Sequence, residues 1–326
     1  MSILVTGAAG YIGSVVTEKL IAENYSVLAL DNLFQGHKEA VAPEATFIYL
    51  DLADKAGLDN VFNKYDIEAV MHFAAYSCVG ESMTKPAEYF RNNVASGINL
   101  LNIMIKHKVL KLVFSSSASI YGEPKTLPIG EKELHNPNSP YGESKLIFEK
   151  MLHWYYHAYG LGSISLRYFN AAGASQCFGE DHNPETHLIP NVLRVALGKQ
   201  EQLNIYGNDY PTNDGSCVRD YIHVLDIAQA HIIALKHLDH NQLFKAYNMG
   251  NGEGYSVLEV IETASRVCGT KIPVKINDRR PGDPASLVAD HALIKKELGW
   301  TPNFPSLESI IDSAWKWHCK FPTGYC

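Results

Sequence analysis

Apolar and polar residues follow two different periods along the first half of the chain. Nearly continuous apolar runs, typical of strands buried on both faces of a parallel sheet, occupy residues 3–5, 26–31, 46–51, 69–74, 112–115 and 163–168. Between these runs, apolar residues recur every three or four positions and predict helices, the longest of which span 85–106 and 140–159. Alternating strands and helices indicate an α/β fold built on a doubly wound parallel (Rossmann) sheet.

The second half of the chain has a different pattern. Residues 171–186 are rich in Gly, Asn and Pro, and we expect a loop there. Shorter elements follow, including a helix near 226–238 and a helix that begins at Ser256, where Ser256 and Glu259 form a capping box. We therefore predict a sheet domain at 1–170 and a smaller C-terminal α/β domain at 171–326, some segments of which return to the sheet.

Length and charge narrow the possible functions. The 326 residues suffice for about two domains. Lys and Arg number 28 against 35 Asp and Glu, and the net charge of −7 argues against nucleic acid or an anionic membrane as the main partner. No apolar stretch approaches the ~20 residues that span a bilayer, and no leader precedes the first strand, so we expect a cytoplasmic protein.

Metal-binding patterns are weak in the sequence. The six cysteines are scattered singly without a CxxC pair, which argues against both a disulfide framework and a zinc site. His153 and His157 have i, i+4 spacing, but they lack the carboxylate of an HExxH pattern and lie among aromatic residues. A packed helix face explains this pair better, and we expect no metal.

The turn after the first strand carries the pattern GxxGxxG. Gly7 permits a tight turn, Gly10 lets a pyrophosphate approach the backbone, and Gly13 lets the helix lie close to the strand. The N-terminus of that helix would face the phosphates with its partial positive charge. Asp31 ends the second strand, where a carboxylate binds ribose hydroxyls, and no Arg follows it closely. Because Asp31 would repel a 2′-phosphate, NAD is favoured over NADP.

Asp51 and Leu52 end the third expected strand. This position suits a contact with the adenine of the dinucleotide. Asp51 fits a helix cap equally well from spacing alone, and the sequence leaves both alternatives open.

Tyr141 and Lys145 form a YxxxK pair on the helix that Pro140 starts. Their i, i+4 spacing puts both side chains on one face, where an ammonium group lowers the pKa of a neighbouring phenol. The strand at 112–115 runs into a serine-rich loop, at the edge of the sheet where ligands bind. A serine hydroxyl there would complete a Ser–Tyr–Lys group in which Tyr141 acts as the base.

Together these motifs resemble those of the extended short-chain dehydrogenases/reductases. A second set is similar to motifs of the UDP-glucose 4-epimerase family: HFAA at 72–75, VGES at 79–82, SSSA at 115–118, YG at 121–122, RYFN at 167–170, GNDYPT at 207–212, VRDYIHV at 218–224 and RRPGD at 279–283. The resemblance runs from Ile3 to about Trp317 and so covers nearly the whole chain.

The resemblance implies a role for each matching residue. Ser117 matches the catalytic serine, Tyr141 the base, and Lys145 its electrostatic partner. With those argued above, the residues expected at NAD are Gly7, Gly10, Tyr11, Ile12, Gly13, Asp31, Asn32, Asp51, Leu52, Phe73, Ala74, Ala75, Asn92, Ser115, Tyr141, Lys145 and Tyr168. Those expected at the UDP-sugar are Ser117, Asn170, His187, Leu188, Tyr206, Arg219, Tyr221, Arg280, Asp283 and Leu287. The implied reaction is epimerisation at C4 of a UDP-hexose, in a homodimer formed by the two long helices.

The chain departs from the family's pattern at three positions. Ser77 stands where many members carry a Lys near the cofactor phosphates, which bears on how tightly NAD is kept. His187 replaces an Asn that often contacts the substrate phosphate. Leu287 matches a position that limits the size of the sugar's 2-substituent, so activity on UDP-N-acetylglucosamine is left open.

Two other functions fit the sequence less well. A nucleotide-sugar 4,6-dehydratase needs an Asp-Glu pair after the serine loop, where this chain has Ala118 and Ser119. A non-enzymatic NAD-sensing protein has no reason to keep Ser117, Tyr141 and Lys145 together.

Overall fold

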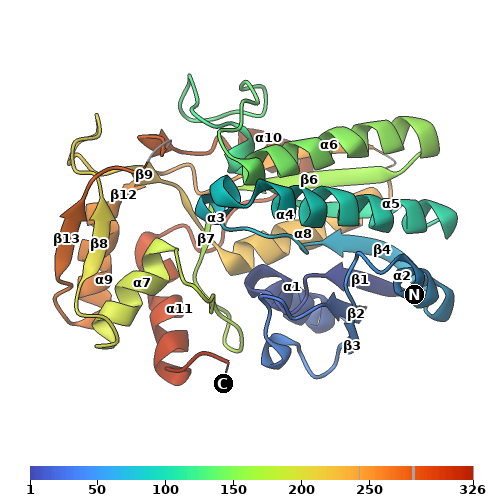
Figure 1. The fold of residues 1–326 in the computed structure, drawn as a ribbon, viewed down its shortest axis with the longest axis horizontal. Helices are drawn as coiled ribbons and strands as arrows, with labels where there is room; N and C mark the ends of the chain where they lie inside the picture. Colours follow the sequence, from blue (N-terminus) through green and yellow to red (C-terminus); the bar gives the residue numbers. More distant parts are fainter. Residues whose placement is uncertain (242, 281–282, 326) are drawn as a thin grey trace.

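The computed structural model describes residues 1–241, 243–280 and 283–325, so Pro281 and Gly282 of the RRPGD motif and Cys326 lie outside the described residues. Within this part, seven parallel strands form a sheet in the order β11-β6-β5-β4-β1-β2-β3 (Figure 1). Their bounds are β1 Ser2–Thr6, β2 Ser26–Asp31, β3 Thr46–Tyr49, β4 Ile67–His72, β5 Lys111–Ser117, β6 Gly162–Tyr168 and β11 Phe244–Met249. The strand order reverses between β1 and β4, which confirms the doubly wound fold class.

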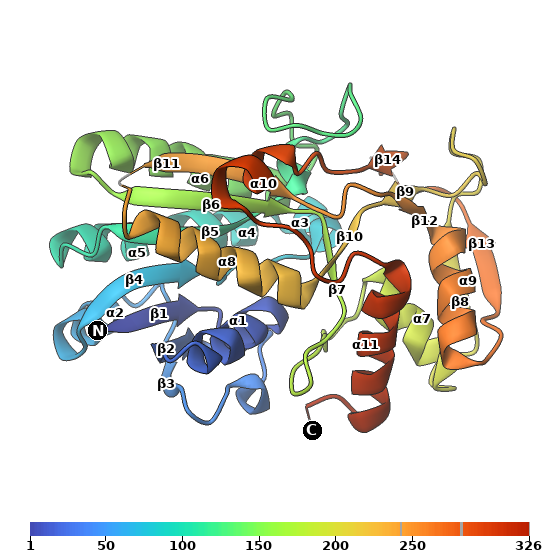
Figure 2. The same ribbon diagram turned by 180° about the vertical axis from the view of Figure 1, so that it is seen from behind.

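Helices cover both faces of the sheet, which is why its strands are apolar throughout. One face carries α1 (Tyr11–Ala22), α8 (Val224–Leu238) and α10 (Ala292–Leu298). The other carries α2 (Lys55–Lys64), α5 (Ser96–Lys106) and α6 (Pro140–Tyr159), and Figures 1 and 2 show these two layers from opposite sides. Each face buries its own apolar core. Among the described residues, no helix combines the length and apolarity of a membrane span.

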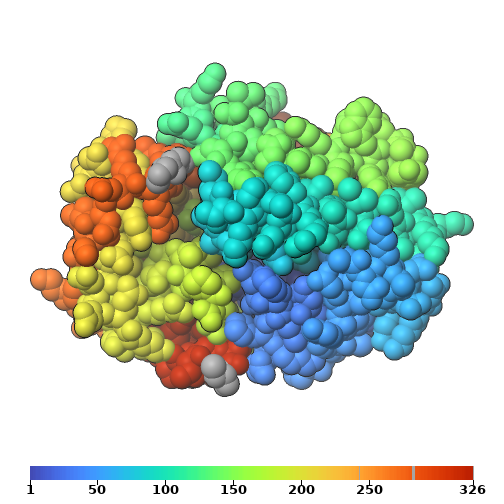
Figure 3. Space-filling model, viewed as in Figure 1, coloured from blue at the N-terminus to red at the C-terminus, as the bar shows by residue number. Residues whose placement is uncertain are grey.

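A second lobe adjoins the carboxyl ends of the strands. Its helices pack around a third apolar core and are α7 (Leu188–Ala196), α9 (Val257–Cys268) and α11 (Leu307–Lys320). Its short strands form three small sheets. Strand β7 (Asn170–Ala172) pairs with β10 (Tyr221–His223), and β8 (Leu203–Tyr206) pairs with β13 (Val274–Asn277). Strand β9 (Val218–Arg219) lies between β12 (Tyr255–Ser256) and β14 (Ser286–Leu287). In Figure 3 this lobe, mostly yellow to orange, meets the blue-to-green part along a seam.

Two segments from the second half of the sequence belong to the sheet layers. Strand β11 pairs with β6 along its whole length, from Phe244 opposite Ser163 to Met249 opposite Tyr168. Helix α8 packs against α1. The division of the chain into domains at 1–170 and 171–326 stays a prediction.

Several elements differ in detail from the sequence-based expectation. The strand expected at 46–51 ends at Tyr49, and the strand expected at 69–74 spans 67–72. The segment expected as a loop at 171–186 begins inside strand β7. The capping box is confirmed, because the Ser256 hydroxyl accepts from the Glu259 N–H while the Glu259 carboxylate accepts from the Ser256 N–H.

The helix expected at 85–106 consists of three segments. Helix α4 (Pro86–Tyr89) runs into a π-helical segment η2 (Phe90–Ala95) and then into α5. The wider π turn carries Asn93, whose side chain bonds both the N–H and the carbonyl of Tyr76 and the hydroxyl of Ser144. This turn therefore ties the loop after β4 to α6, next to the site described below.

Candidate active site

Glycines shape the turn between β1 and α1. Gly7 has a φ of +73°, and a Cβ there would lie 2.6 Å from the Ala74 nitrogen. At Gly13 a Cβ would lie 2.1 Å from the Gly7 carbonyl oxygen, so the helix and the turn need glycine to approach so closely. Gly10 caps α1 without a side-chain hydrogen bond. This leaves a cradle and a helix N-terminus suited to a pyrophosphate.

Asp31 holds the far end of this cradle. Its Oδ2 accepts from the Ala9 N–H at 2.9 Å, and its Oδ1 accepts from the Leu33 N–H at 2.8 Å. Burial raises the pKa of the Asp31 carboxyl, and these backbone bonds offset part of the increase. The carboxylate is thus fixed at the end of β2, where a ribose would lie.

Asp51 lies beside Asn32 at the same end of the site. The Asn32 amide donates to Asp51 Oδ2 at 2.7 Å, and the Ala53 N–H donates to Asp51 Oδ1 at 2.8 Å. The N-cap of α2 is Asp54, which accepts from the Gly57 N–H at 2.9 Å. The alternative that Asp51 caps the helix is therefore wrong.

Ser117, Tyr141 and Lys145 come together at the carboxyl end of β5. Ser117 is the last residue of β5. Helix α6 begins directly after its N-cap Ser139, whose hydroxyl accepts from the Gly142 N–H at 3.1 Å. The Lys145 ammonium donates to the Ser115 carbonyl at 2.8 Å. The Ser117 hydroxyl acts on the Tyr141 phenol, whose pKa it lowers, and it donates to the Ser119 hydroxyl at 3.1 Å. The i, i+4 geometry thus brings the phenol and the ammonium to the same strand end.

Burial is the largest influence on the pKa of both Tyr141 and Lys145. It lowers the pKa of the Lys145 ammonium to about 7, although the Glu149 carboxylate opposes the shift. It raises the pKa of the Tyr141 phenol, and the hydrogen bond with Ser117 offsets part of this increase. The expected lowering of the Tyr141 pKa by Lys145 is not seen, because desolvation of the phenolate outweighs other influences. Lys145 titrates close to neutral pH.

Arginines and aromatic rings form the opposite side of the site. Arg219 on β9 is paired with Asp283. The Arg280 guanidinium lies 4.0 Å from the centre of the Tyr206 ring. Leu287 on β14 is the register partner of Arg219, so both face the site from one small sheet. Cationic groups of this kind suit a diphosphate.

A cavity of about 1240 Å³ joins the two sides. Every residue that the sequence places at the catalytic group, at NAD or at the UDP-sugar lines this cavity. The structure therefore brings all of these residues together, while their individual roles stay predictions.

Comparison with known proteins agrees with this geometry. Residues 3–250 match the NAD dependent epimerase/dehydratase family. A UDP-glucose 4-epimerase of Halalkalibacterium halodurans is 51% identical over 327 residues, which cover 100% of this chain and 98% of that protein. The chain belongs to the UDP-glucose 4-epimerase family.

Solved structures of UDP-glucose 4-epimerases share the fold along the whole chain. One crystal structure gives a TM-score of 0.98 at 49% identity and covers 100% of both chains. The enzyme of Bifidobacterium longum in complex with NAD+ and UDP gives a TM-score of 0.95 at 39% identity, covering 99% of this chain and 100% of that chain.

Two charged residues behind the reacting group were not singled out from the sequence. Glu149 lies one helical turn after Lys145 on α6 and pairs with Arg167, with 2.9 Å between the Arg167 Nε and the Glu149 Oε1. Both are buried, and the Ser116 hydroxyl also donates to Glu149 at 2.5 Å. The signal that could have found Glu149 is its i, i+4 spacing from Lys145, which puts it on the same helix face.

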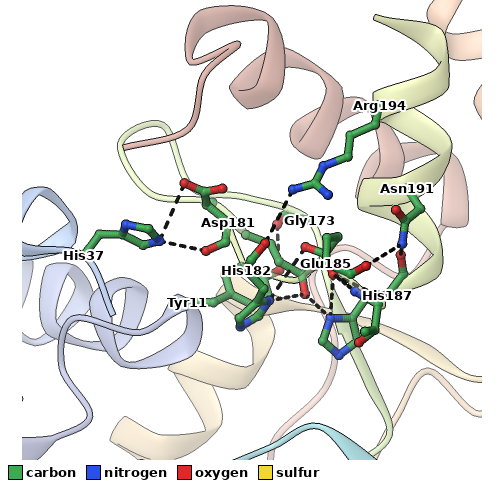
Figure 4. Close-up of polar contacts among 12 residues, drawn as sticks. Tyr11, His37, Gly173, Asp181, His182, Glu185, His187, Asn191 and Arg194 are labelled. Atoms are coloured by element: carbon green, nitrogen blue, oxygen red, sulfur yellow. Dashed lines mark hydrogen bonds and ion pairs between the residues drawn. The ribbon is translucent and has the colours of Figure 1, made fainter. Parts of the chain in front are cut away.

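Three residues that the sequence reasoning missed, Glu180, His182 and Glu185, lie with the predicted His187 in the loop before α7. Glu180, His182, Glu185 and His187 all line the cavity, and their donor atoms lie within 4.8 Å of one another. Figure 4 shows His182, Glu185 and His187 of this group. Burial disfavours the charged form of His182, but the carboxylates of Glu180 and Glu185 outweigh it and raise its pKa to about 9. The signal in the sequence is the spacing Glu-x-His-x-x-Glu-x-His.

Proposed function

We propose that the chain interconverts UDP-glucose and UDP-galactose by inverting C4 of the hexose. The observation that carries this proposal is one shared cavity. It brings Ser117, Tyr141 and Lys145 next to the glycine turn on one side and to Arg219 and Arg280 on the other. A site for redox chemistry and a site for a diphosphate sugar thus meet at the same point.

NAD fits the first of these sites. The cradle at Gly7 and Gly13 leaves no room for a Cβ, and the open N-terminus of α1 and the carboxylate of Asp31 suit a pyrophosphate and a ribose. When bound, NAD accepts the hydride of C4 and returns it in the second half of the reaction. Ser77 and its neighbours after β4 also line the cavity.

Tyr141 moves the proton. Its phenol oxygen takes the proton of the 4-hydroxyl during oxidation and gives it back to the 4-keto oxygen after the sugar has turned. The Ser117 hydroxyl, which lines the cavity together with Tyr141, holds the sugar oxygen in place. Protonation of Lys145 favours the phenolate, because an adjacent positive charge stabilises the anion.

The second site has to hold UDP firmly and the hexose loosely, because the 4-keto sugar must present both faces. Arg219 and Arg280 supply bidentate donors for the diphosphate. Asn170, Leu188, Tyr206 and Tyr221 also line the cavity. Most of the binding energy then comes from contacts with UDP, and the sugar stays free to turn.

The alternative substrate is UDP-N-acetylglucosamine, alone or together with UDP-glucose. Leu287 lines the cavity and is intermediate in size, which leaves space for a 2-substituent undecided. A 4,6-dehydratase is disfavoured because Ala118 and Ser119 form the short helix η3 (Ala118–Ile120) after β5, where elimination needs carboxylates.

We also propose a cytoplasmic homodimer. Large apolar side chains are exposed on the two helices expected at the interface, with Ile98 on α5 and Trp154 and Tyr159 on α6. The cysteines among the described residues are free thiols, as in a reducing compartment. Sedimentation equilibrium at two protein concentrations would test the dimer, and a single species at monomer mass would contradict it.

The deciding experiment is an epimerase assay on the protein as purified. We expect conversion of UDP-glucose to UDP-galactose with no added NAD and no net NADH. Accumulation of NADH would indicate a dehydrogenase, and a 4-keto-6-deoxy product would indicate a dehydratase. The same assay with UDP-N-acetylglucosamine would decide between the two sugar specificities.

A further inference from the structure

Four side chains of one short loop converge beside α1. Glu180, His182, Glu185 and His187 each offer one donor atom, and these atoms all lie within 4.8 Å of one another. Figure 4 shows the two imidazole rings and the Glu185 carboxylate turned toward each other. The reaction proposed above assigns no task to Glu180, His182 or Glu185.

The distances between carboxylate and imidazole donors are close to those between ligands around a small ion. His182 Nδ1 lies 3.2 Å from Glu180 Oε1 and 3.8 Å from Glu185 Oε2. His187 Nδ1 lies 2.8 Å from Glu180 Oε1 and 3.0 Å from Glu185 Oε1. Metal–ligand bonds of about 2.0 Å at tetrahedral angles put neighbouring donors roughly 3.3 Å apart.

Two of the donor atoms have no hydrogen-bond partner. Glu185 Oε2 and His182 Nδ1 are both buried from water and make no hydrogen bond of good geometry, although both take part in the ion pairs given above. The Glu185 side chain is only 1% exposed, so water cannot satisfy it from outside. Buried polar atoms rarely go without a hydrogen bond, and these two lie 3.8 Å apart within the cluster.

We propose that this loop binds a divalent cation of the Zn²⁺ class through Glu180, His182, Glu185 and His187. Imidazole nitrogen and carboxylate oxygen are common zinc donors, and four protein ligands make a closed, structural type of site. The two carboxylates supply the two negative charges that balance the ion.

Such an ion would fix the wall of the cavity. The Tyr11 hydroxyl already donates to the Gly173 carbonyl at 2.7 Å, and the His182 ring lies edge-on to the Tyr11 ring. His187 is the N-cap residue of α7, so the ion would join the start of that helix to the loop resting on α1. The site is independent of which sugar the protein accepts.

Metal titration of the full-length, NAD-loaded protein tests the proposal. After removal of metals with a chelator and dialysis, we expect one equivalent of Co²⁺ per chain and the intense visible absorption of four-coordinate Co²⁺. Zn²⁺ should displace Co²⁺ and abolish the band. His182→Gln and Glu185→Gln should each weaken binding at least tenfold and remove the band.

The matched control is the other histidine pair on α6. His153 and His157 have ring centres 4.5 Å apart and could bind a metal at the surface. A variant with His153→Gln and His157→Gln should keep the single equivalent and its band. Loss of the band in this control, or its survival in both loop variants, would overturn the proposal.

A second measurement uses the unmutated protein, so misfolding of a variant cannot affect its result. In crystals soaked with Zn²⁺, an anomalous peak should lie between the four donor atoms. No peak there, or a peak only at other residues, would refute the site. Circular dichroism and retained NAD would show that the loop variants are folded.

Discussion

The two sides of the cavity are built in different ways. The cofactor side rests on the ends of long parallel strands and on α1 and α6, and it consists of the glycine turn, Asp31, Ser117, Tyr141 and Lys145. The substrate side rests on short strands and loops, and it consists of Tyr206, Arg219, Arg280, Asp283 and Leu287. On the cofactor side, backbone groups hold two charged side chains, the Lys145 ammonium at the Ser115 carbonyl and the Asp31 carboxylate at the Ala9 and Leu33 N–H groups. On the substrate side, the Arg219 guanidinium is held by the Asp283 side chain as well as by the Val218 carbonyl.

This difference follows from the tasks of the two sides. Proton and hydride transfer need reacting atoms held within a fraction of an ångström, which continuous strands provide. A site that must let a sugar turn is better made from side chains that exchange one partner for another. The Arg219–Asp283 pair gives the arginine a partner that a diphosphate can replace.

The largest expected effect comes from Tyr141→Phe. Without the hydroxyl, no group at this position takes the 4-hydroxyl proton, so kcat should fall about 1000-fold. Binding of UDP should hardly change, which would separate the two sides of the cavity. Tyr159→Phe, an exposed change on the same helix, serves as the control and should stay within twofold of the parent kcat. Near-full activity of Tyr141→Phe would exclude it as the base.

Arg219→Ala should mainly affect binding. Loss of charge-assisted hydrogen bonds to the diphosphate should raise the Kd of UDP roughly 10- to 100-fold in calorimetric titration. The amount of NAD that copurifies should not change, because Arg219 lies on the substrate side. Arg266→Ala, which removes an exposed side chain 3.7 Å from Glu308, is the matched control. Equal loss of NAD and UDP would show that the two sides are not separate.

Acid should destabilise both sides together through three buried histidines. Burial lowers the pKa of His72 to about 3 and the pKa of His223 and His231 to about 4. In the unfolded chain the histidines have a pKa near 6.5 and bind protons below that pH, whereas in the folded chain they stay neutral. The free energy of unfolding is therefore highest above pH 6.5 and falls as the pH drops below it. Each histidine should cost about 2 kcal/mol of unfolding free energy between pH 7 and pH 5.

Urea unfolding at several pH values measures this effect. His231→Leu replaces one of the three histidines and should reduce the slope of stability against pH in this range. His72 belongs to the sheet and His223 to the second lobe, so one cooperative transition is expected. Separate acid transitions of the sheet and the second lobe would show that the two unfold as independent domains.

The smallest effect is expected at Leu287. Leu287→Ala enlarges the cavity next to Arg219, and the ratio of kcat/KM for UDP-N-acetylglucosamine over UDP-glucose should rise about tenfold. Leu287→Tyr should lower the same ratio. Changes of equal sign in both variants would show that Leu287 does not limit the 2-substituent.

The cofactor side could be predicted from sequence because its signals are local. The apolar runs, the glycine spacing and the Tyr141–Lys145 pair each lie within one turn or one element, and each maps directly onto a strand end or a helix face. Even the errors are small, as in the two-residue shift of β4. Tyr141 is the exception, since its raised pKa depends on burial that spacing does not reveal.

The substrate side was accessible mainly through resemblance. Its pairs join residues far apart in the chain, such as Arg219 with Asp283 and Leu287 with Arg219, and no local pattern encodes these contacts. The same reason hid the partnership of Glu149 with Arg167. By contrast, the cluster from Glu180 to His187 is local, but its spacing matches none of the common metal motifs.

The position of β11 at the edge of the sheet has a consequence for synthesis of the protein on the ribosome. Strand β6 is complete at Tyr168, but the strand that covers its free edge ends only at Met249. A nascent chain of intermediate length therefore has all strands of the sheet except β11, and the edge of β6 is open. Such an open edge can pair with strands of other molecules. The match to the family ends at residue 250, directly after that edge is closed.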